Sequence, residues 1–300
     1  MPKKSSNSFS LMTAPERTIQ VQHYRSENPR KLVIMAPAMA VPHSYYREFC
    51  QWLTTQGYDV LGFDYYGIGA SQPGSLRKID SSITDWARFD AQCVLNYALD
   101  NFPALPTVWF AHSIGGQIFG MLERHDEVER MVTVATGTGY WRETQTGLKY
   151  KSWLLWRGIV PWLLPLVGYF PGERLGIVGN VPRSAMAQWR QWCLHPDYLV
   201  GAEQLYERYA GVETPIISLA FSDDELLTRR NITAMHDFYR NAPQRREFVT
   251  PADCGVARIG HFALFRPRAQ QLWQQLLAPQ INAALPVADT ALASATPDAG

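Results

Sequence analysis

The sequence lacks most of the residues from which metal centres, disulfides and nucleic-acid surfaces are built. Only four of its 300 residues are cysteine, and none is spaced as a CxxC pair or as a metal ligand. Scattered cysteines in a chain of this length indicate reduced thiols in a cytoplasmic protein. The formal net charge is +1, and no basic run with interleaved aromatic residues occurs. We therefore expect no metal, no cofactor and no nucleic-acid partner.

Long apolar runs are also missing. The first 15 residues are polar and charged, without the apolar core of a secretory signal, and are predicted to be disordered. The most apolar stretch, residues 153–170 (WLLWRGIVPWLLPLVGYF), is interrupted by Arg157 and two prolines. These interruptions argue against a membrane span, which needs about 20 residues. The Ala/Pro-rich tail, residues 281–300, is likewise predicted to be disordered.

Buried strands alternate with helical patterns through most of the remaining chain. From about residue 31 to residue 138, apolar runs such as KLVIMA and PTVWFAH are each followed by a helical pattern. The alternation stops over residues 140–212, which are rich in tryptophan, proline and tyrosine, and then resumes. It predicts an α/β core, residues 16–139 and 213–280, with a mostly parallel sheet covered by helices on both faces. Residues 140–212 are expected to form a helical insert.

The strand that ends at His112 stops abruptly at Ser113, and a helix follows at once. Small residues lie two positions before and after the serine, at Ala111 and Gly115, as a tight turn from strand to helix requires. Such a turn exposes the hydroxyl above the sheet, where it acts as a nucleophile if a base lies within reach. The free N–H of Ile114 would stabilise an oxyanion. The alternative is an ordinary serine that caps a helix.

Candidate partners for the serine follow two later strands. SLAFSDDE places Asp223 and Asp224 after one strand, and ARIGHFALF places His261 in the loop before the closing helix. Both segments lie at the carboxyl edge of the sheet, where open α/β sheets build their sites. A serine, an aspartate and a histidine in this order form the set that nucleophilic acyl transfer needs.

Five motifs together resemble the Ser-His-Asp α/β hydrolase superfamily: APAMAVPHSYYREF, GFDYYGIGAS, AHSIGG, FSDDE and IGHFALFRP. The chain is similar to the bacterial branch of predicted α/β hydrolases near the serine-aminopeptidase and lysophospholipase-like group. The resemblance implies an α/β-hydrolase fold with a helical cap, Ser113 as nucleophile and His261 as general base. It favours Asp224 as the acid, because a threonine follows four residues later, and Asp223 stays the alternative.

The resemblance also implies a second oxyanion donor in the loop after the strand of residues 31–36. This loop reads Ala36-Pro37-Ala38-Met39 where the family often has His-Gly. Pro37 has no N–H, so the backbone of Ala38 or of Met39 is the expected donor, together with that of Ile114.

These features predict a serine hydrolase that cleaves a carboxylic ester, or a related thioester or amide, through an acyl-enzyme on Ser113. An acyltransferase with the same catalytic residues and a non-catalytic binding module are the alternatives. The aromatic insert favours a small acyl substrate with an apolar group, although most of its aromatic residues are expected to pack the insert onto the core. Contact of residues 153–170 with a membrane or an apolar partner is the less favoured interpretation. The sequence leaves the oligomeric state open.

Overall fold

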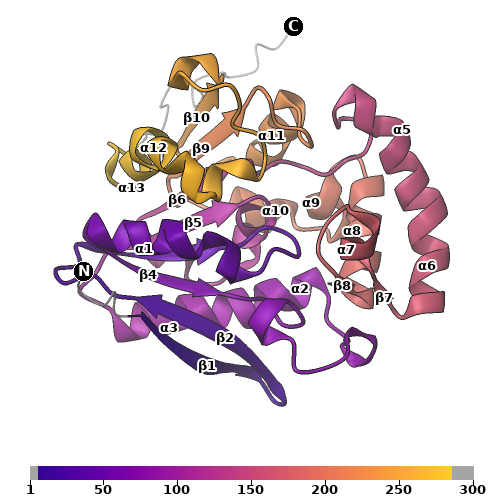
Figure 1. Ribbon diagram of the computed structural model, residues 1–300, viewed down its shortest axis with the longest axis horizontal. Coiled ribbons are helices and arrows are strands. Elements are labelled where there is room, and N and C mark those ends of the chain that lie inside the picture. The colour runs from indigo at the N-terminus through magenta and orange to yellow at the C-terminus, as the bar shows by residue number, and fades with distance from the viewer. Residues whose placement is uncertain (1–5, 286–300) are drawn as a thin grey trace, which may run out of the picture.

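A computed structural model describes residues 6–285 and centres on a sheet of eight strands in the order β1-β2-β4-β3-β5-β6-β9-β10 (Figure 1). The six strands from β4 to β10 in this order run parallel, whereas β1 and β2 form an antiparallel hairpin at one edge. The strands are β1 (Ser6–Ala14), β2 (Arg17–Tyr24), β3 (Lys31–Ala36), β4 (Tyr58–Phe63), β5 (Thr107–His112), β6 (Arg130–Val134), β9 (Ile216–Phe221) and β10 (Gln244–Val249).

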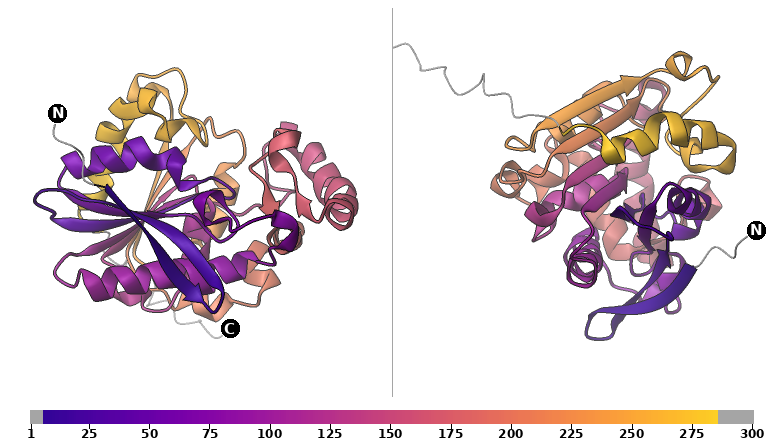
Figure 2. Two further views of the ribbon diagram at one scale, coloured as in Figure 1. Left: turned by 60° about the horizontal axis from the view of Figure 1, so that its bottom comes forward. Right: turned by 90° about the vertical axis from the view of Figure 1, so that its left-hand side faces the viewer.

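Helices cover both faces of the sheet, and the left view of Figure 2 shows α1 and α3 on opposite sides of it. Neighbouring residues of β5 divide between the two faces, as alternation along a strand requires. Trp109 belongs to the buried cluster on one face, with Val94 of α3, and Phe110 belongs to the cluster on the other face, with Phe49 of α1 and Trp273. Because both faces are covered, β5 reads in the sequence as a continuous apolar run. The predicted α/β fold with a mostly parallel sheet is confirmed.

The helices fall into two groups along the chain. Those of the core are α1 (Arg47–Thr55), α2 (Ile83–Asp85), α3 (Gln92–Asn101), α4 (Ile114–Gln117), α11 (Arg229–His236), α12 (Gln270–Leu272) and α13 (Ala278–Asn282). Those between β6 and β9 are α5 (Thr146–Leu154), α6 (Val160–Val167), α7 (Gly172–Leu175), α8 (Arg183–Leu194), α9 (Tyr198–Ala202) and α10 (Tyr206–Ala210), with the short pair β7 (Tyr169–Phe170) and β8 (Val181–Pro182).

The segment between β6 and β9, residues 140–212, is called the insert below. Its helices α5 to α8 lie together at one side of the sheet (Figure 1). Its last helix, α10, packs back on the core, where Tyr209 Oη donates to Gln117 O at 2.6 Å. Over residues 6–285, every helix is too short or too polar to traverse a bilayer.

The prediction of a disordered N-terminus over residues 1–15 is wrong for residues 6–14, which form β1. This strand pairs with β2 along its length, and Phe9 packs on Tyr97 of α3 with 5.0 Å between the ring centroids. The serine-rich sequence hides the strand because β1 is an edge strand that leaves most of its side chains in solvent. Residues 1–5 lie outside the described residues.

The predicted disordered tail, residues 281–300, begins too early. Helix α13 continues to Asn282, and Ile281 is fully buried one turn after Leu277. Arg130 Nη1 also donates to Ala283 O at 2.6 Å, which holds the end of the helix against β6. The apolar spacing of the last helix therefore outweighs the alanine-rich composition that follows it. Residues 286–300 lie outside the described residues.

Candidate active site

The turn at Ser113 is strained and firmly held. Ser113 has φ 52° and ψ −114°, a positive φ that L-residues rarely adopt and that costs about 1–3 kcal/mol. Its N–H donates to Val134 O at 3.0 Å, and Thr136 Oγ1 donates to its carbonyl oxygen at 2.9 Å. These bonds hold the corner between β5 and α4 in the conformation that presents the side chain above the sheet.

Small residues around Ser113 are explained by close backbone contacts. A Cβ on Gly115 would lie 2.5 Å from the carbonyl oxygen of Ala36, and one on Gly116 would lie 2.7 Å from Thr136 Oγ1. Ala111 is fully buried and is paired in register with Ala36 of β3, so two small side chains lie beside each other below the turn. An alanine therefore fits two residues before Ser113.

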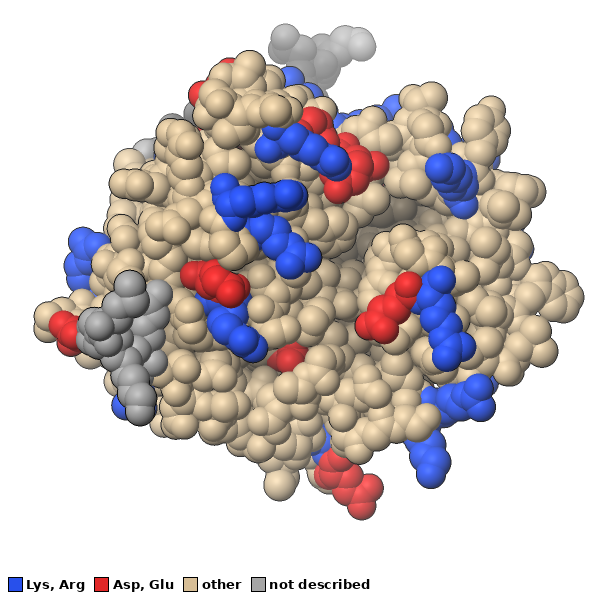
Figure 3. Space-filling model, in the orientation of Figure 1, with Lys and Arg blue, Asp and Glu red and all other residues tan. Residues whose placement is uncertain are grey.

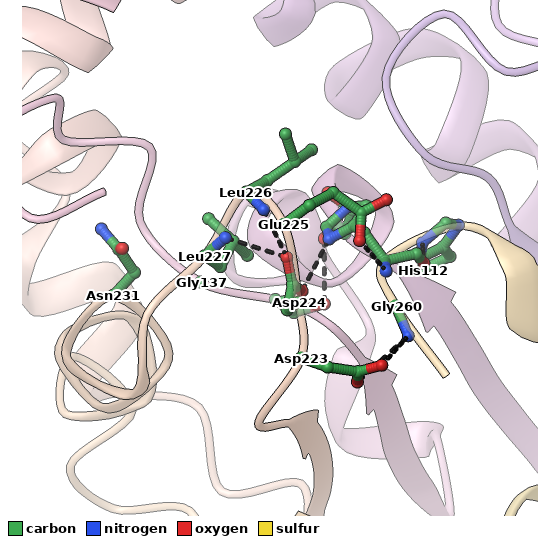
Figure 4. A network of polar contacts seen from close by, with 12 residues as sticks. His112, Gly137, Asp223, Asp224, Glu225, Leu226, Leu227, Asn231 and Gly260 are labelled. Carbon is green, nitrogen blue, oxygen red and sulfur yellow. Dashed lines mark hydrogen bonds and ion pairs between the residues drawn. The ribbon is translucent and has the colours of Figure 1, made fainter. Parts of the chain in front are cut away.

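His261 and Asp224 come together from loops after two different strands. His261 Nδ1 lies 2.8 Å from Asp224 Oδ2, and both side chains are buried. The other carboxylate oxygen, Oδ1, accepts the N–H groups of Leu226 and Leu227 at 2.8 and 2.9 Å (Figure 4). Asp224 is thus fixed by its own loop, and one oxygen remains for the imidazole.

Asp223 has a different partner. Its carboxylate accepts the N–H of Ile259 at 2.8 Å. It also accepts the N–H of Gly260 at 3.2 Å (Figure 4). The next acidic residue, Glu225, accepts the N–H of His261 at 2.9 Å. Two carboxylates therefore hold the backbone of the His261 loop, and the third holds the ring. Glu225 was not among the predicted site residues, although it forms part of the FSDDE motif.

Ser113 and His261 line a common cavity of about 140 Å³. Among the described residues, no hydrogen bond joins Ser113 Oγ to the imidazole. The insert contributes six apolar residues to the lining: Leu148, Leu155, Trp156, Ile177, Val178 and Trp189. A more open hollow of about 480 Å³, lined by residues between Val256 and Leu272, contains neither Ser113 nor His261.

The two expected positions of the second oxyanion donor differ in their hydrogen bonds. The N–H of Ala38 donates to Tyr46 Oη at 3.0 Å. The N–H groups of Met39 and Ile114 have no acceptor among the described residues, and both residues line the cavity with Ser113. Met39 therefore has the available N–H, whereas that of Ala38 is already bonded.

Tyr46 and His112 connect the loop of Ala38 to the loop of His261. Tyr46 Oη donates to His112 Nδ1 at 2.8 Å, and His112 Nε2 donates to His261 O at 3.0 Å. The carbonyl oxygen only accepts, so the proton of the neutral ring lies on Nε2. Burial lowers the pKa of His112 well below its usual value, which keeps the ring neutral. Tyr46 was not among the predicted site residues, because its partner His112 lies 66 residues away along the chain.

Metal-ligating residues are not grouped here: over residues 6–285, no three His, Cys, Asp or Glu side chains are placed to hold a metal ion.

Known proteins with similar sequences or structures agree with this fold. The family described as serine aminopeptidase, S33, matches residues 27–175, and no curated protein matches the chain significantly. A soluble variant of monoglyceride lipase from Saccharomyces cerevisiae is 14% identical, with a TM-score of 0.60, over 92% of this chain and 94% of that one.

Two further solved structures are similar to a comparable degree. The esterase PF2001 of Pyrococcus furiosus is 14% identical, with a TM-score of 0.58, over 91% of this chain and 88% of its own. A thioesterase domain from the curacin biosynthetic pathway is 15% identical, with a TM-score of 0.56, over 90% of this chain and 98% of its own. The chain therefore has the α/β-hydrolase fold, and the predicted resemblance to the α/β hydrolase superfamily is confirmed.

Proposed function

We propose that the protein is a serine hydrolase that cleaves a carboxylic ester, or a related thioester or amide, through an acyl-enzyme on Ser113. The observation that carries the proposal is the pairing of His261 with Asp224 at 2.8 Å, on the cavity that the strained Ser113 also lines. A strand-to-helix turn, an imidazole and a buried carboxylate are the parts that activate a serine hydroxyl.

The catalytic steps follow from these positions. Ser113 Oγ attacks the substrate carbonyl carbon while His261 Nε2 takes its proton, and Asp224 stabilises the imidazolium that results. The N–H groups of Ile114 and Met39 stabilise the negative carbonyl oxygen. His261 then returns the proton to the leaving group as its bond to carbon breaks. A water molecule, deprotonated by His261, attacks the acyl-enzyme and releases the acid and the free Ser113 hydroxyl.

The substrate that we propose is a small molecule with an apolar group next to its scissile carbonyl. The lining from the insert supports this, because apolar walls bind apolar groups by removing them from water. Two polar groups on the same cavity are already bonded to each other, since Tyr198 Oη donates to Gln117 Oε1 at 3.1 Å. We place the activity in the cytoplasm, which the four free cysteines support.

Labelling with a fluorophosphonate probe tests the nucleophile. The wild-type chain should be labelled, and Ser113→Ala should not. Ser152→Ala is the matched control, because Ser152 lines the same cavity without lying at the turn, and it should be labelled like the wild type. Absence of label on the folded wild type, or equal labelling of Ser113→Ala, would disprove the proposal.

Turnover of p-nitrophenyl esters separates hydrolysis from acyl transfer. A hydrolase should release the free acid whether or not an acceptor alcohol or thiol is added. A product in which the acyl group has moved almost wholly to the acceptor would assign the same residues to an acyltransferase. A labelled chain that turns over no ester, thioester or amide would indicate a binding module.

A further inference from the structure

Exposed large hydrophobic side chains are concentrated in one part of the molecule. Residues 6–285 contain ten such side chains, and all but Met12 and Leu285 belong to the insert. Trp162 is 75% exposed, Leu166 is 82% exposed and Tyr150 is 85% exposed. We call these eight side chains the apolar surface: Tyr150, Trp153, Leu154, Ile159, Trp162, Leu166, Leu175 and Ile177.

Most of the apolar surface lies on one long helix. α5, a π-helical turn over Leu155–Ile159 and α6 follow one another without a break from Thr146 to Val167. One side of this helix is buried through Trp156, Val160 and Leu164. The other side is apolar as well, although it faces solvent. A helix that is apolar all round is normally covered, so folding of the chain alone does not account for the outer side.

The charges around the apolar surface are mostly positive. Residues 144–177 contain Lys149, Lys151, Arg157 and Arg174, and Glu173 is the one carboxylate among them. In Figure 3 the right-hand margin, where Figure 1 places α5 and α6, is mostly tan. Exposed tryptophan, tyrosine and leucine with interspersed lysine and arginine is the composition of helices that lie in a lipid headgroup region.

We propose that the apolar surface docks the protein on an anionic lipid bilayer, with the helix of α5 and α6 lying in the plane of the headgroups. A second copy of the chain fits this surface less well. A two-fold contact would bring the positive charges of both copies, on Lys149, Lys151 and Arg157, to one interface, and Glu173 is the one carboxylate of residues 144–177 that could pair with them. Anionic lipid phosphates supply the missing negative charge, and the lipid tails cover the rings.

Docking would bring the cavity close to the lipid. Leu148, Leu155 and Trp156 of the same helix line the cavity with Ser113, so the helix separates the cavity from the apolar surface by about its own diameter, roughly 10 Å. Ile177 belongs to both, since it is exposed and also lines the cavity. An apolar substrate dissolved in the bilayer would therefore have a short path to Ser113.

Cosedimentation with vesicles tests the apolar part of the proposal. The full chain should bind vesicles made of equal parts phosphatidylglycerol and phosphatidylcholine. The double variant Trp162→Ser with Leu166→Ser should bind at least about tenfold more weakly, because two large side chains no longer leave water. Met12→Ser is the matched control: Met12 is 71% exposed but lies on β1, and its loss should leave binding unchanged.

Single charge variants test the lipid charge. Lys151→Gln should weaken binding to the phosphatidylglycerol vesicles about fivefold, and added salt should weaken binding of the wild type. Arg240→Gln makes the same change of net charge at an exposed position outside the insert and should have no effect. Vesicles of pure phosphatidylcholine should bind the wild type more weakly than the anionic ones.

Three results would overturn the docking proposal. One is a folded wild-type chain that does not bind anionic vesicles, and another is equal weakening by Met12→Ser and by the double variant. The third is a dimer in sedimentation velocity that the double variant dissociates, without vesicle binding by the wild type, which would assign the surface to a second copy. Ser113→Ala should bind vesicles like the wild type, so docking and the proposed hydrolysis succeed or fail separately.

Discussion

The carboxyl edge of the sheet and the insert line the same cavity, but different forces hold them. At the edge, hydrogen bonds fix each group: Asp224 holds the ring of His261, and Asp223 and Glu225 hold its backbone. In the insert, apolar side chains form much of the cavity wall, as where Trp156 packs edge-on against Trp189 with 5.1 Å between ring centroids. Hydrogen bonds fix directions, whereas apolar packing fixes mainly volume. The edge therefore suits bond chemistry, and the insert suits recognition of an apolar group.

The largest effect on kcat should come from substitution of Ser113, at the turn between β5 and α4. Ser113→Ala and Ser113→Gly both remove the hydroxyl and should lower kcat about ten-thousand-fold or more. Glycine accepts a positive φ without steric cost, which outweighs its larger entropy in the unfolded chain. The glycine variant should thus have a free energy of unfolding about 1 kcal/mol above that of the alanine variant, measured by urea denaturation. Equal stabilities would contradict the strain at this turn.

Substitution of the two neighbouring aspartates should lower kcat to very different extents. Asp224→Asn removes the acceptor that orients the imidazole and stabilises its charge, so kcat should fall about a thousand-fold. Asp223→Asn leaves the pair of His261 and Asp224 in place and should lower kcat only about tenfold. Ester turnover by both purified variants measures the difference. The reverse order would assign the catalytic acid to Asp223.

Removal of the Tyr46 hydroxyl tests whether hydrogen bonds couple the loop of Ala38 to the loop of His261. Tyr46→Phe leaves the N–H of Ala38 and Nδ1 of His112 without their partner. The free energy of unfolding should fall by about 1–3 kcal/mol, and kcat should fall about tenfold to a hundredfold with little change in KM. Tyr97→Phe is the control, because the Tyr97 hydroxyl forms no hydrogen bond among the described residues. A loss of stability with unchanged kcat would limit Tyr46 to a structural role.

The smallest effect should come from the wall of the insert. Leu155→Ala enlarges the cavity and should raise kcat/KM for longer acyl chains relative to shorter ones about tenfold, with kcat for short chains nearly unchanged. Leu99→Ala, a partly buried leucine of α3 outside the cavity, should leave this ratio unchanged. A uniform loss for every chain length would show that the insert also positions the catalytic groups.

Sequence patterns predicted the core well because its strands are buried on both faces. The continuous apolar run PTVWFAH indicated a buried strand, and the small residues Ala111 and Gly115 indicated the tight turn at Ser113. The edge strand β1 was missed because half-exposed strands carry a weaker signal, which serine obscures in this chain. Local pattern therefore identifies elements best where the fold buries them most.

Contacts between distant loops were harder to predict. Asp223 and Asp224 are adjacent, so only the path of the backbone decides which one faces His261. Tyr46 and His112 are 66 residues apart and meet only after the sheet has formed. The exposure of Trp162 was equally hard to predict, because Trp156 is also a tryptophan of the same helix and yet is buried. In each of these cases the deciding information lies in the tertiary arrangement.

The run of three acidic residues, 223–225, has a consequence for how this loop can vary. Each carboxylate holds a different group on the segment from Ile259 to His261. An insertion or deletion of one residue just before Asp224 would shift the three carboxylates relative to the segment from Ile259 to His261. A residue other than Asp224 would then lie next to the imidazole. Natural variants should therefore keep the length of this loop while its side chains outside the three acids change, and length changes should accumulate in the insert instead.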